Sequence, residues 1–394
     1  MNNFTTDIAH ALVQHQDVNE IFRSHLEHAV NQLLQTELTS FLDYEKYDAA
    51  GIGSGNSRNG TYERTLKTEF GELSLAIPRD RNGDFHQQTV APYKRTNDTL
   101  EAFVMHMYHK GVTTAEIADL LERMYGHHYT PQTISNMTQT MEAEVEAFRC
   151  RPLAKRYACI YLDATFIALK RDTVAKEAVY IAVGIQEDGS KEVLAYLLAP
   201  TESAGNWQEL LEDLQVRGLE EVLLVVSDGL AGMTDAIHAV YPSARHQTCC
   251  VHVSRTLARK VRVQDRAAVC ADFKTVYRAN GREEATHALE AFIAAWSSRY
   301  PSVRRVLNEH PTLLTFYDFP SAIWRSLYST NLIESFNKQL KKYVKRKEQF
   351  PNEASIERFL VSRFDAYNQK FSTRCHLGFA QAQHQLEDMF QRQG

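Results

Sequence analysis

Three apolar runs separated by short connections constrain the fold of this chain most strongly. They span residues 157–169, 178–186 and 192–199, with the sequences YACIYLDATFIAL, AVYIAVGIQ and EVLAYLLA. Runs of this length and composition predict β-strands, and the turn signal Asp188-Gly189 joins the last two runs as a hairpin. The segment therefore predicts an antiparallel meander of three strands.

After the meander, the pattern predicts alternating helices and strands. We expect a helix over residues 206–217, a strand buried on both faces over 221–227, a helix over 232–240 and a fifth strand over 244–251. The order β-β-β-α-β-α-β is that of a ribonuclease H-like α/β core with a mixed sheet and right-handed crossovers. In this order the first and fourth strands are neighbours.

The N-terminal part reads differently. Apolar residues at three- and four-residue spacing predict an amphipathic helix between positions 17 and 42. The glycine-rich stretch 51–60 is preceded by no buried strand, so we interpret it as a linker or mobile loop rather than a phosphate-binding loop. Two short strands are predicted over 65–70 and 72–77, before the turn signal Asn82-Gly83.

A pair of helices with a short connection follows. Thr113 or Thr114 caps the first, Gly126 ends it, and Thr130-Pro131 starts the second. This pattern fits a DNA-binding helix-turn-helix, and an ordinary helical hairpin fits it equally well. In the first case the second helix presents short polar side chains to DNA: Gln132, Thr133, Ser135 and Asn136.

Two aspartates lie on or next to strands that the pattern predicts to be buried. Asp163 interrupts the first strand, and Asp228 directly follows the fourth. Ionised carboxylates are seldom buried without compensation, and the two strands are neighbours. We therefore expect the two side chains to converge on a hard divalent cation, Mg²⁺ or Mn²⁺.

A third acid is expected from a helix packed on the sheet, and Glu334 is the candidate because it lies one turn into a predicted helix. Metal ions held by such acids activate a water or a 3′-hydroxyl for attack on a phosphodiester and stabilise the leaving oxygen. Simpler roles remain open: a solvated edge-strand acid for Asp163, an N-cap or Asx turn for Asp228, and a surface glutamate for Glu334.

Several other residues are expected to support this site. Cys249 and His252 have the spacing of half a zinc site, but a structural zinc needs four ligands and no second pair lies nearby. We expect them instead to pack or hydrogen-bond beside the acids. Arg255 follows one turn later, positioned for phosphate, and Asn331 lies at the start of the helix of Glu334.

Two clusters of basic residues could follow a phosphate backbone, or form solvated helix faces. The first follows Glu334 and contains Lys338, Lys341, Lys342, Lys345, Arg346 and Lys347. The second contains Arg255, Arg259, Lys260, Arg262 and Arg266. In the first cluster, four side chains at helical spacing are expected to contact phosphates: Lys341, Lys342, Lys345 and Arg346.

Composition narrows the class of protein. The 394 residues carry a formal net charge of -5, so only the local clusters point to nucleic acid. Six cysteines without a repeating spacing do not make a disulfide framework. No apolar run approaches the length of a bilayer span, and the first residues lack the features of a signal peptide. We expect a cytoplasmic protein without membrane partners, associated with the nucleoid when bound to DNA.

Several blocks of the sequence resemble, in order, those of Mutator-like transposases encoded by bacterial insertion sequences. They include TYERTLKTEFGELSLAIPRDRNGDF, YLDATFIALKRD, VVSDGLAGM, QTCCVHVSR and YSTNLIESFNKQLKKYVKRKEQFPNE. The resemblance implies that Asp163, Asp228 and Glu334 form an Asp-Asp-Glu triad that uses Mg²⁺. It also implies that Cys249 and His252 are the Cys-x-x-His signature of the family.

The same resemblance implies an enzyme that binds double-stranded DNA, both the terminal inverted repeats of its element and the target. It would cut and join DNA strands as a homodimer or higher oligomer. Two other functions remain open: a non-catalytic DNA-binding regulator derived from a transposase, and a metal-dependent nuclease or resolvase.

The predicted organisation has six parts. They are a helical region at 1–50, a flexible loop with a short β-hairpin at 51–95, a helix-turn-helix region at 96–150, the first part of the ribonuclease H-like core at 151–252, an all-α insertion at 253–320, and C-terminal helices that complete the core at 321–394.

Overall fold

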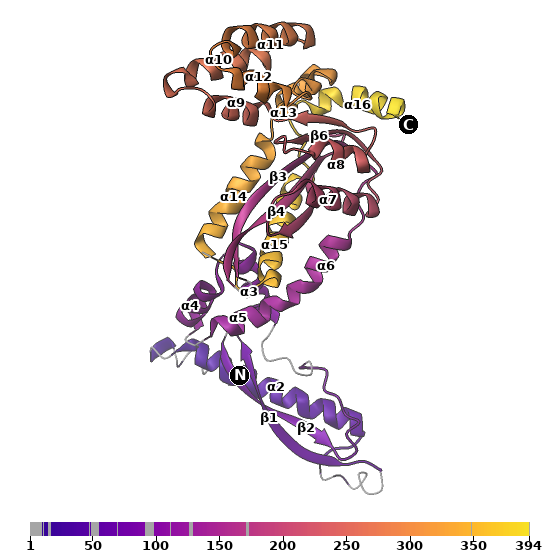
Figure 1. Cartoon of the computed structure of the whole chain (residues 1–394). Coiled ribbons are helices and arrows are strands. Elements are labelled where there is room, and N and C mark those ends of the chain that lie inside the picture. The colour runs from indigo at the N-terminus through magenta and orange to yellow at the C-terminus, as the bar shows by residue number, and fades with distance from the viewer. Residues whose placement is uncertain are drawn as a thin grey trace. The chain divides into compact units, whose positions relative to one another are not determined.

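The chain divides into two compact units, Met1–Thr140 and Met141–Gly394, whose elements are labelled in Figure 1. The structure is a computed structural model, and each unit is described by itself. The described residues are 10, 12–14, 17–46, 48, 55–68, 70–90, 98–110, 112–125, 129–170, 173–347 and 349–393.

The first unit contains a long helix and a β-hairpin. Helix α2 (Val18–Leu42) covers strand β2 (Gly71–Asp80), which pairs antiparallel with β1 (Arg58–Thr68). The hairpin is longer than predicted, and β1 begins inside the stretch interpreted as a linker. The outer half of β1 is exposed on both faces, so it lacks the apolar alternation by which a strand is recognised in sequence.

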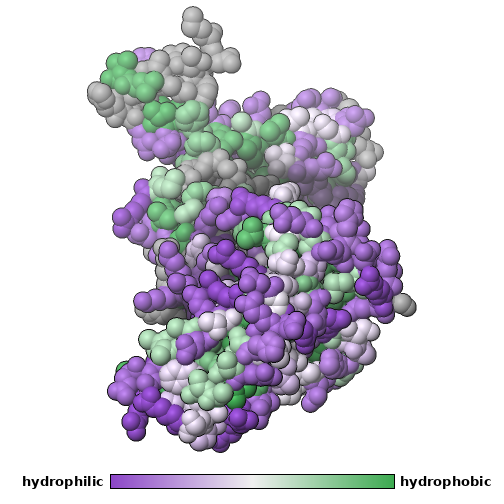
Figure 2. Space-filling view, turned by 90° about the horizontal axis from the view of Figure 1, so that it is seen from above, coloured by the Kyte–Doolittle hydropathy of each residue, from purple (hydrophilic) through white to green (hydrophobic). Residues whose placement is uncertain are grey.

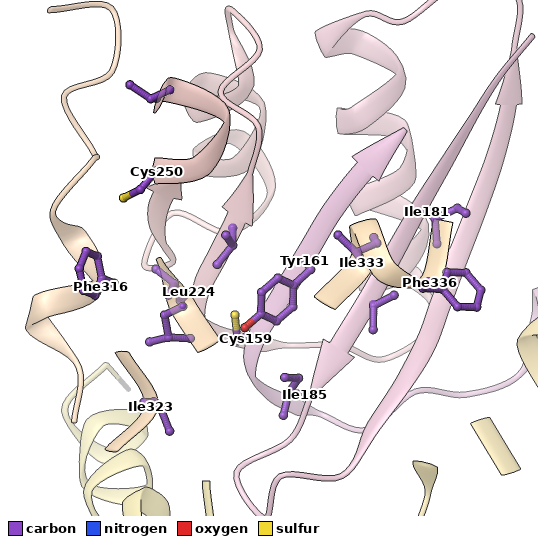
Figure 3. Packing of buried hydrophobic residues seen from close by; sticks show 14 of the residues in the cluster. Cys159, Tyr161, Ile181, Ile185, Leu224, Cys250, Phe316, Ile323, Ile333 and Phe336 are labelled. Atoms are coloured by element: carbon purple, nitrogen blue, oxygen red, sulfur yellow. The ribbon is translucent and has the colours of Figure 1, made fainter. Parts of the chain in front are cut away.

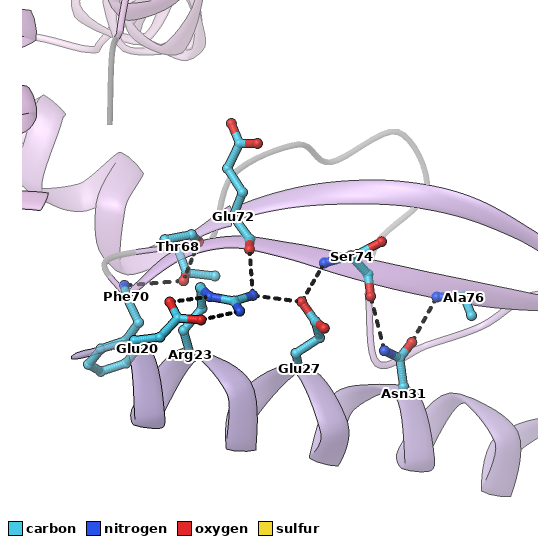
Figure 4. Close-up of polar contacts among 10 residues, drawn as sticks. Glu20, Arg23, Glu27, Asn31, Thr68, Phe70, Glu72, Ser74 and Ala76 are labelled. Carbon is cyan, nitrogen blue, oxygen red and sulfur yellow. Dashed lines mark hydrogen bonds and ion pairs between the residues drawn. The ribbon is translucent and has the colours of Figure 1, made fainter. Parts of the chain in front are cut away.

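The open edge of β2 is paired by side chains of α2 rather than by another strand (Figure 4). Asn31 donates from Nδ2 to the Ser74 carbonyl (3.0 Å) and accepts from the Ala76 N–H at Oδ1 (2.7 Å). One turn earlier, the Glu27 carboxylate accepts from the Ser74 N–H (2.8 Å). An unpaired strand edge is a template for association with other chains, and these contacts satisfy it internally.

Three further helices complete the described part of the first unit: α3 (Asp98–His109), α4 (Thr114–Tyr125) and α5 (Pro131–Met137). Helix α4 begins with a capping box, in which the Thr113 hydroxyl accepts from the Glu116 N–H (3.1 Å) and the Glu116 carboxylate accepts from the Thr113 N–H (2.8 Å). Thr130 caps α5 and Pro131 is its first residue, as predicted. Gly126, expected to end α4, lies outside the described residues.

The second unit is built on a five-stranded mixed sheet with the order β5-β4-β3-β6-β7. Strands β3, β4 and β5 form an antiparallel meander, and β6 and β7 run parallel to β3. The strands are β3 (Arg156–Lys170), β4 (Val174–Ile185), β5 (Lys191–Ala199), β6 (Glu221–Ser227) and β7 (Arg245–Thr248). The predicted strand order is confirmed. Strand β7 is shorter than predicted because residues 250 and 251 already belong to the next helix.

Helices cover both faces of this sheet (Figure 1). Alternate side chains of β3 belong to different buried clusters: Leu162 packs with α7 (Ala204–Val216) and α8 (Met233–Val240), while Tyr161 packs with α14 (Asn331–Lys347) and α15 (Glu353–Phe371). Helix α6 (Glu142–Cys150) packs against α15. In Figure 3, Ile333 and Phe336 of α14 lie beside Tyr161 and Ile181 of the sheet. Helix α14 is thus fixed on the face of β3 to which odd-numbered residues point.

Between β7 and α14 the chain is helical. Residues 253–320, all of which are described, contain no strand. The helices are α9 (Cys250–Arg259), α10 (Arg266–Val276), α11 (Arg282–Ser297) and α12 (Pro301–Asn308), followed by the short α13 (Trp324–Leu327); α16 (Phe379–Gln393) comes after α15. Within the described ranges no helix is long and apolar enough to cross a membrane. On the face shown in Figure 2, hydrophilic residues predominate.

We predict that Asn31→Ala destabilises the pairing of α2 with the hairpin by about 1–3 kcal/mol, because a donor and an acceptor of β2 lose their partners. Hydrogen exchange of the peptide that contains Ala76 measures this directly, and protection should fall. Gln32→Ala, at an exposed position of the same helix, is the matched control. Equal protection in both variants would contradict the role assigned to Asn31.

Candidate active site

Asp163 and Asp228 lie at the same level of the sheet. The last parallel pair between β3 and β6 is Tyr161 with Val226, and each aspartate follows its member of this pair by two positions. Strand β3 has β4 on one side and β6 on the other, so Asp163 is not an edge-strand acid. Both side chains are partly buried.

Asp228 begins the turn that ends β6. Its Oδ1 accepts from the Leu230 N–H (3.3 Å), which is the Asx-type contact considered for it from the sequence. The next residue, Gly229, has a φ of 86°, and a Cβ there would lie 2.7 Å from the Thr248 side chain. Only glycine fits this tight turn against β7, so the turn fixes the place of the Asp228 carboxylate at the strand end.

Asn337 of α14 holds the Asp163 carboxylate. Its Nδ2 donates to Asp163 Oδ2 (2.8 Å), and Asn337 is only 4% exposed. The other amide atom, Asn337 Oδ1, is buried and has no hydrogen-bond partner among the described residues. Sequence analysis missed Asn337. A signal was available, since Asn337 follows Glu334 by three positions in a predicted helix and therefore shares its face.

The electrostatics of Asp163 reflect a cluster of acids. Burial raises its pKa to about 6, against the favourable hydrogen bond from Asn337. The negative charges of Asp228 and Glu334 raise this pKa further, whereas His252 lowers it. The charges of the other two predicted acids therefore act on Asp163.

Glu334 lies in the first turn of α14 and is held by a guanidinium. Arg255 donates from Nη1 to Oε1 (3.0 Å) and from Nη2 to Oε2 (3.1 Å), a bidentate ion pair. The Thr330 hydroxyl (3.4 Å) and His252 Nε2 (3.5 Å) also lie close to Oε1. Arg255 was predicted to be positioned for a phosphate. In the structure its guanidinium contacts Glu334.

Cys249 links the start of α9 to the start of α14. Its sulfur accepts from the His252 N–H (3.5 Å), from the Thr330 N–H (3.3 Å) and from the Thr330 hydroxyl (3.3 Å). Burial alone would raise the pKa of this thiol, but the hydrogen bonds from His252 and Thr330 outweigh it and lower the pKa. The hydrogen bond with Cys249 raises the pKa of His252. The two residues thus join the starts of α9 and α14, beside Glu334.

Other predicted residues lie elsewhere. Asn331 is exposed at the start of α14 and lines a pocket of about 440 Å³ with Ser335 and His376, whose lining contains none of the three acids. On α14, Lys338, Lys341, Lys342 and Lys345 are exposed, and the side chain of Arg346 lies outside the described atoms. On α5, Gln132 and Asn136 are exposed and bonded to each other (2.9 Å), while Thr133 and Ser135 are half-buried.

Among the described residues, one group of side chains brings its possible ligand atoms together. Cys249, His252 and Glu334 each bring one ligand atom to within 4.8 Å of the others, a mixed sulfur, nitrogen and oxygen set. The acids Asp163, Asp228 and Glu334 do not form such a group, although the charges of Asp228 and Glu334 act on Asp163. Their donor atoms, and the unpartnered Asn337 Oδ1, are all oxygen, which is the ligand type that Mg²⁺ and Mn²⁺ prefer. The donor chemistry of the predicted acids therefore suits either ion.

Comparison with known proteins decides the family. A family model described as "Transposase, Mutator family" matches residues 2–373. The chain belongs to the Mutator family of transposases. The transposase for insertion sequence element IS905 of Lactococcus lactis is 49% identical over 390 residues, which cover 99% of this chain and 100% of that protein. The resemblance inferred from the sequence blocks is confirmed.

More distant members give the same result. The transposase for IS1201 of Lactobacillus helveticus is 47% identical and covers 91% of this Mutator-family chain and 98% of its own. That for ISRM3 of Rhizobium meliloti is 34% identical, over 84% and 82%. Among solved structures, the Drosophila P element transposase strand transfer complex aligns over 79% of this chain and 87% of that chain at 10% identity, with a TM-score of 0.31. A TM-score this low supports no conclusion about the fold.

We predict that Asp163→Asn stabilises the metal-free protein at about pH 8 by an amount on the order of 1–3 kcal/mol. The pKa of Asp163 is raised from 3.8 to about 6, so the native state binds this proton more tightly than the unfolded chain does. The unfolding free energy of the wild type therefore falls as pH rises from about 4 to 6, and the variant lacks this fall.

Urea unfolding at a series of pH values measures the difference. Asp388→Asn, at an exposed position of α16, is the control and should show no such trend. A variant less stable than the wild type above pH 6 would show that the ionised Asp163 carboxylate does not destabilise the native state.

Proposed function

We propose that this chain binds the terminal inverted repeats of an insertion sequence and catalyses metal-dependent DNA strand cleavage and strand transfer at Asp163, Asp228 and Glu334. The observation that carries the proposal is the pair of aspartates at one level of β3 and β6, where burial first and then the charges of Asp228 and Glu334 raise the pKa of Asp163 to about 6. A buried acid whose pKa is raised beside other carboxylates is typical of a functional site.

The architecture supports this assignment. A meander followed by two parallel strands, with helices on both faces, is the arrangement expected of a ribonuclease H-like core. The helical segment between β7 and α14 would then be the all-α insertion between the second and third acids. The insertion-sequence transposases similar to this chain over nearly its full length support the same function.

The chain's own residues have distinct roles in this proposal. Asp163 and Asp228 would hold Mg²⁺ or Mn²⁺ from the sheet, and Glu334 from α14. Bound divalent ions supply a lowered pKa for the attacking water or 3′-hydroxyl and charge stabilisation for the leaving oxygen. Asn337 holds one oxygen of Asp163 in place, which leaves the other oxygen for a metal ion. Cys249 and His252 hold the two helix starts together beside the acids.

DNA would follow the exposed face of α14. Lys338, Lys341 and Lys345 succeed Glu334 at intervals of four, seven and eleven positions, so they share its side of the helix and lead away from the acids. Lys342 lies beside them. Exposed lysines at this spacing suit phosphates rather than base edges. The inverted repeat would be read by α5, through Gln132 and Asn136, and two element ends would be held by a homodimer or higher oligomer.

We predict that Asp163→Asn, Asp228→Asn and Glu334→Gln each lower strand cleavage by at least about 10³-fold, because each removes a charged metal ligand. Binding of an inverted-repeat duplex should persist in a gel-shift assay. Asp388→Asn serves again as the control. Undiminished cleavage by any of the three variants would refute that residue's role, and nicked products without strand-transfer joints would favour a nuclease.

We predict that replacing Lys338, Lys341 and Lys345 with glutamine weakens DNA binding equally for all sequences. Each lost phosphate contact should reduce the slope of log affinity against log salt concentration by about 1. Titrations of specific and random duplexes at several salt concentrations measure both quantities. Lys370→Gln, at an exposed position of α15, controls for the loss of one charge and is compared with each of the three single Lys→Gln variants. A change in sequence preference would argue that these lysines contact bases.

A further inference from the structure

The acid proposed as the third metal ligand is fully engaged by a cation of the protein itself. The Arg255 guanidinium donates one hydrogen bond to each oxygen of Glu334, at 3.0 and 3.1 Å. A divalent ion needs the same oxygens, and two positive charges repel each other at such separations. Arg255 and a metal ion therefore compete for Glu334.

The position of Arg255 makes the ion pair accessible. Its side chain is 47% exposed, against 24% for Glu334. It lies on α9, whose next exposed cation, Arg259, follows after one turn, and Lys338 of α14 follows Glu334 by one turn. A DNA backbone that approaches Glu334 would thus come close to the exposed side chain of Arg255.

A phosphate offers Arg255 a replacement for Glu334 with the same geometry. A guanidinium binds two phosphate oxygens through the same pair of parallel N–H bonds that it makes to a carboxylate. The exchange keeps both hydrogen bonds of Arg255 and releases both oxygens of Glu334 from the guanidinium. A lysine at this position could neutralise a charge, but it could not make the pair of parallel hydrogen bonds (the fork) to a carboxylate or to a phosphate.

We propose that Arg255 is a positioning residue that holds Glu334 in the DNA-free protein and exchanges it for a DNA phosphate, so that the metal site is completed only on DNA. This inference rests on the proposed function, because it requires Glu334 to be a metal ligand. It makes DNA binding and metal binding cooperative, and the coupling is reciprocal: each ligand strengthens the other by the same factor.

The affinity for Mn²⁺, measured from the electron paramagnetic resonance signal of the free ion, tests the exchange without relying on activity. The full chain is titrated with and without a short duplex, and the binding of Mn²⁺ to the duplex alone is subtracted. Removing any nearby cation favours Mn²⁺, so Arg259→Gln, one turn further along α9, is the control for general charge. Arg255→Lys keeps the charge and removes the fork.

We expect Arg255→Gln to raise the affinity of the DNA-free protein for Mn²⁺ about five- to tenfold beyond the effect of Arg259→Gln. We also expect it to reduce the gain in affinity that DNA produces, and Arg255→Lys to give an intermediate effect. Adding Glu334→Gln to Arg255→Gln should cancel the increase, because the freed ligand is then missing.

Each other result has a defined meaning. If Arg255→Gln and Arg259→Gln change the affinity for Mn²⁺ equally, the proposed exchange is wrong. A lower affinity for Mn²⁺ in Arg255→Gln would also overturn it, because Arg255 would then orient Glu334 for the metal ion. If Glu334→Gln fails to weaken Mn²⁺ binding in the DNA complex, the proposed metal site itself is wrong. If it does weaken binding there while Arg255→Gln has no effect, only the exchange is wrong.

Discussion

The parallel pairing of β3 with β6 is the constraint on which the site depends. Its register brings Asp163 and Asp228 to one level, at the point where β6 ends and the chain must turn at Gly229. The outer strands and the two helical layers keep these central strands buried, so Asp163 lies in surroundings that disfavour its charge. The ionised carboxylate lowers the free energy of unfolding, and it places negative charge where a cation could bind. Local destabilisation of this kind is typical of active sites.

A second set of contacts holds the helix that carries Glu334 and Asn337 against the sheet. Ile333 and Phe336 fix α14 on the sheet, and the sulfur of Cys249 accepts hydrogen bonds from both His252 and Thr330, at the starts of α9 and α14. Glu334 and Asn337 are one turn apart on the helix held in this way, so Asn337 binds Asp163 while Glu334 binds Arg255. In this structure the Glu334 carboxylate is thus paired with Arg255, and Asp163 with Asn337.

Much of this could be predicted from sequence, because strand order and buried acids leave local patterns. Period and composition identified the five strands, and an acid within or directly after a buried strand identified Asp163 and Asp228. The pairing of the acids with their partners left no such pattern, because Arg255 and Glu334 are separated by 79 positions and Asn337 and Asp163 by 174. Helical spacing could place Asn337 on the face of Glu334, but it could not show that its amide contacts Asp163. The end of β7 was also misplaced, since a cysteine in the role of a helix cap looks like one more apolar strand residue. Likewise, the outer half of β1 is exposed on both faces and shows no alternation.

In the function we propose, the carboxylates of Asp163, Asp228 and Glu334 hold divalent cations at the reacting phosphodiester. Anomalous diffraction from crystals of the DNA complex grown with Mn²⁺ locates those cations. We expect a peak with oxygen ligands from Asp163, Asp228 and Glu334 at about 2.0–2.2 Å, with Arg255 turned to a phosphate. A peak bound by Cys249 and His252 instead, or Glu334 still paired with Arg255 beside the DNA, would contradict it.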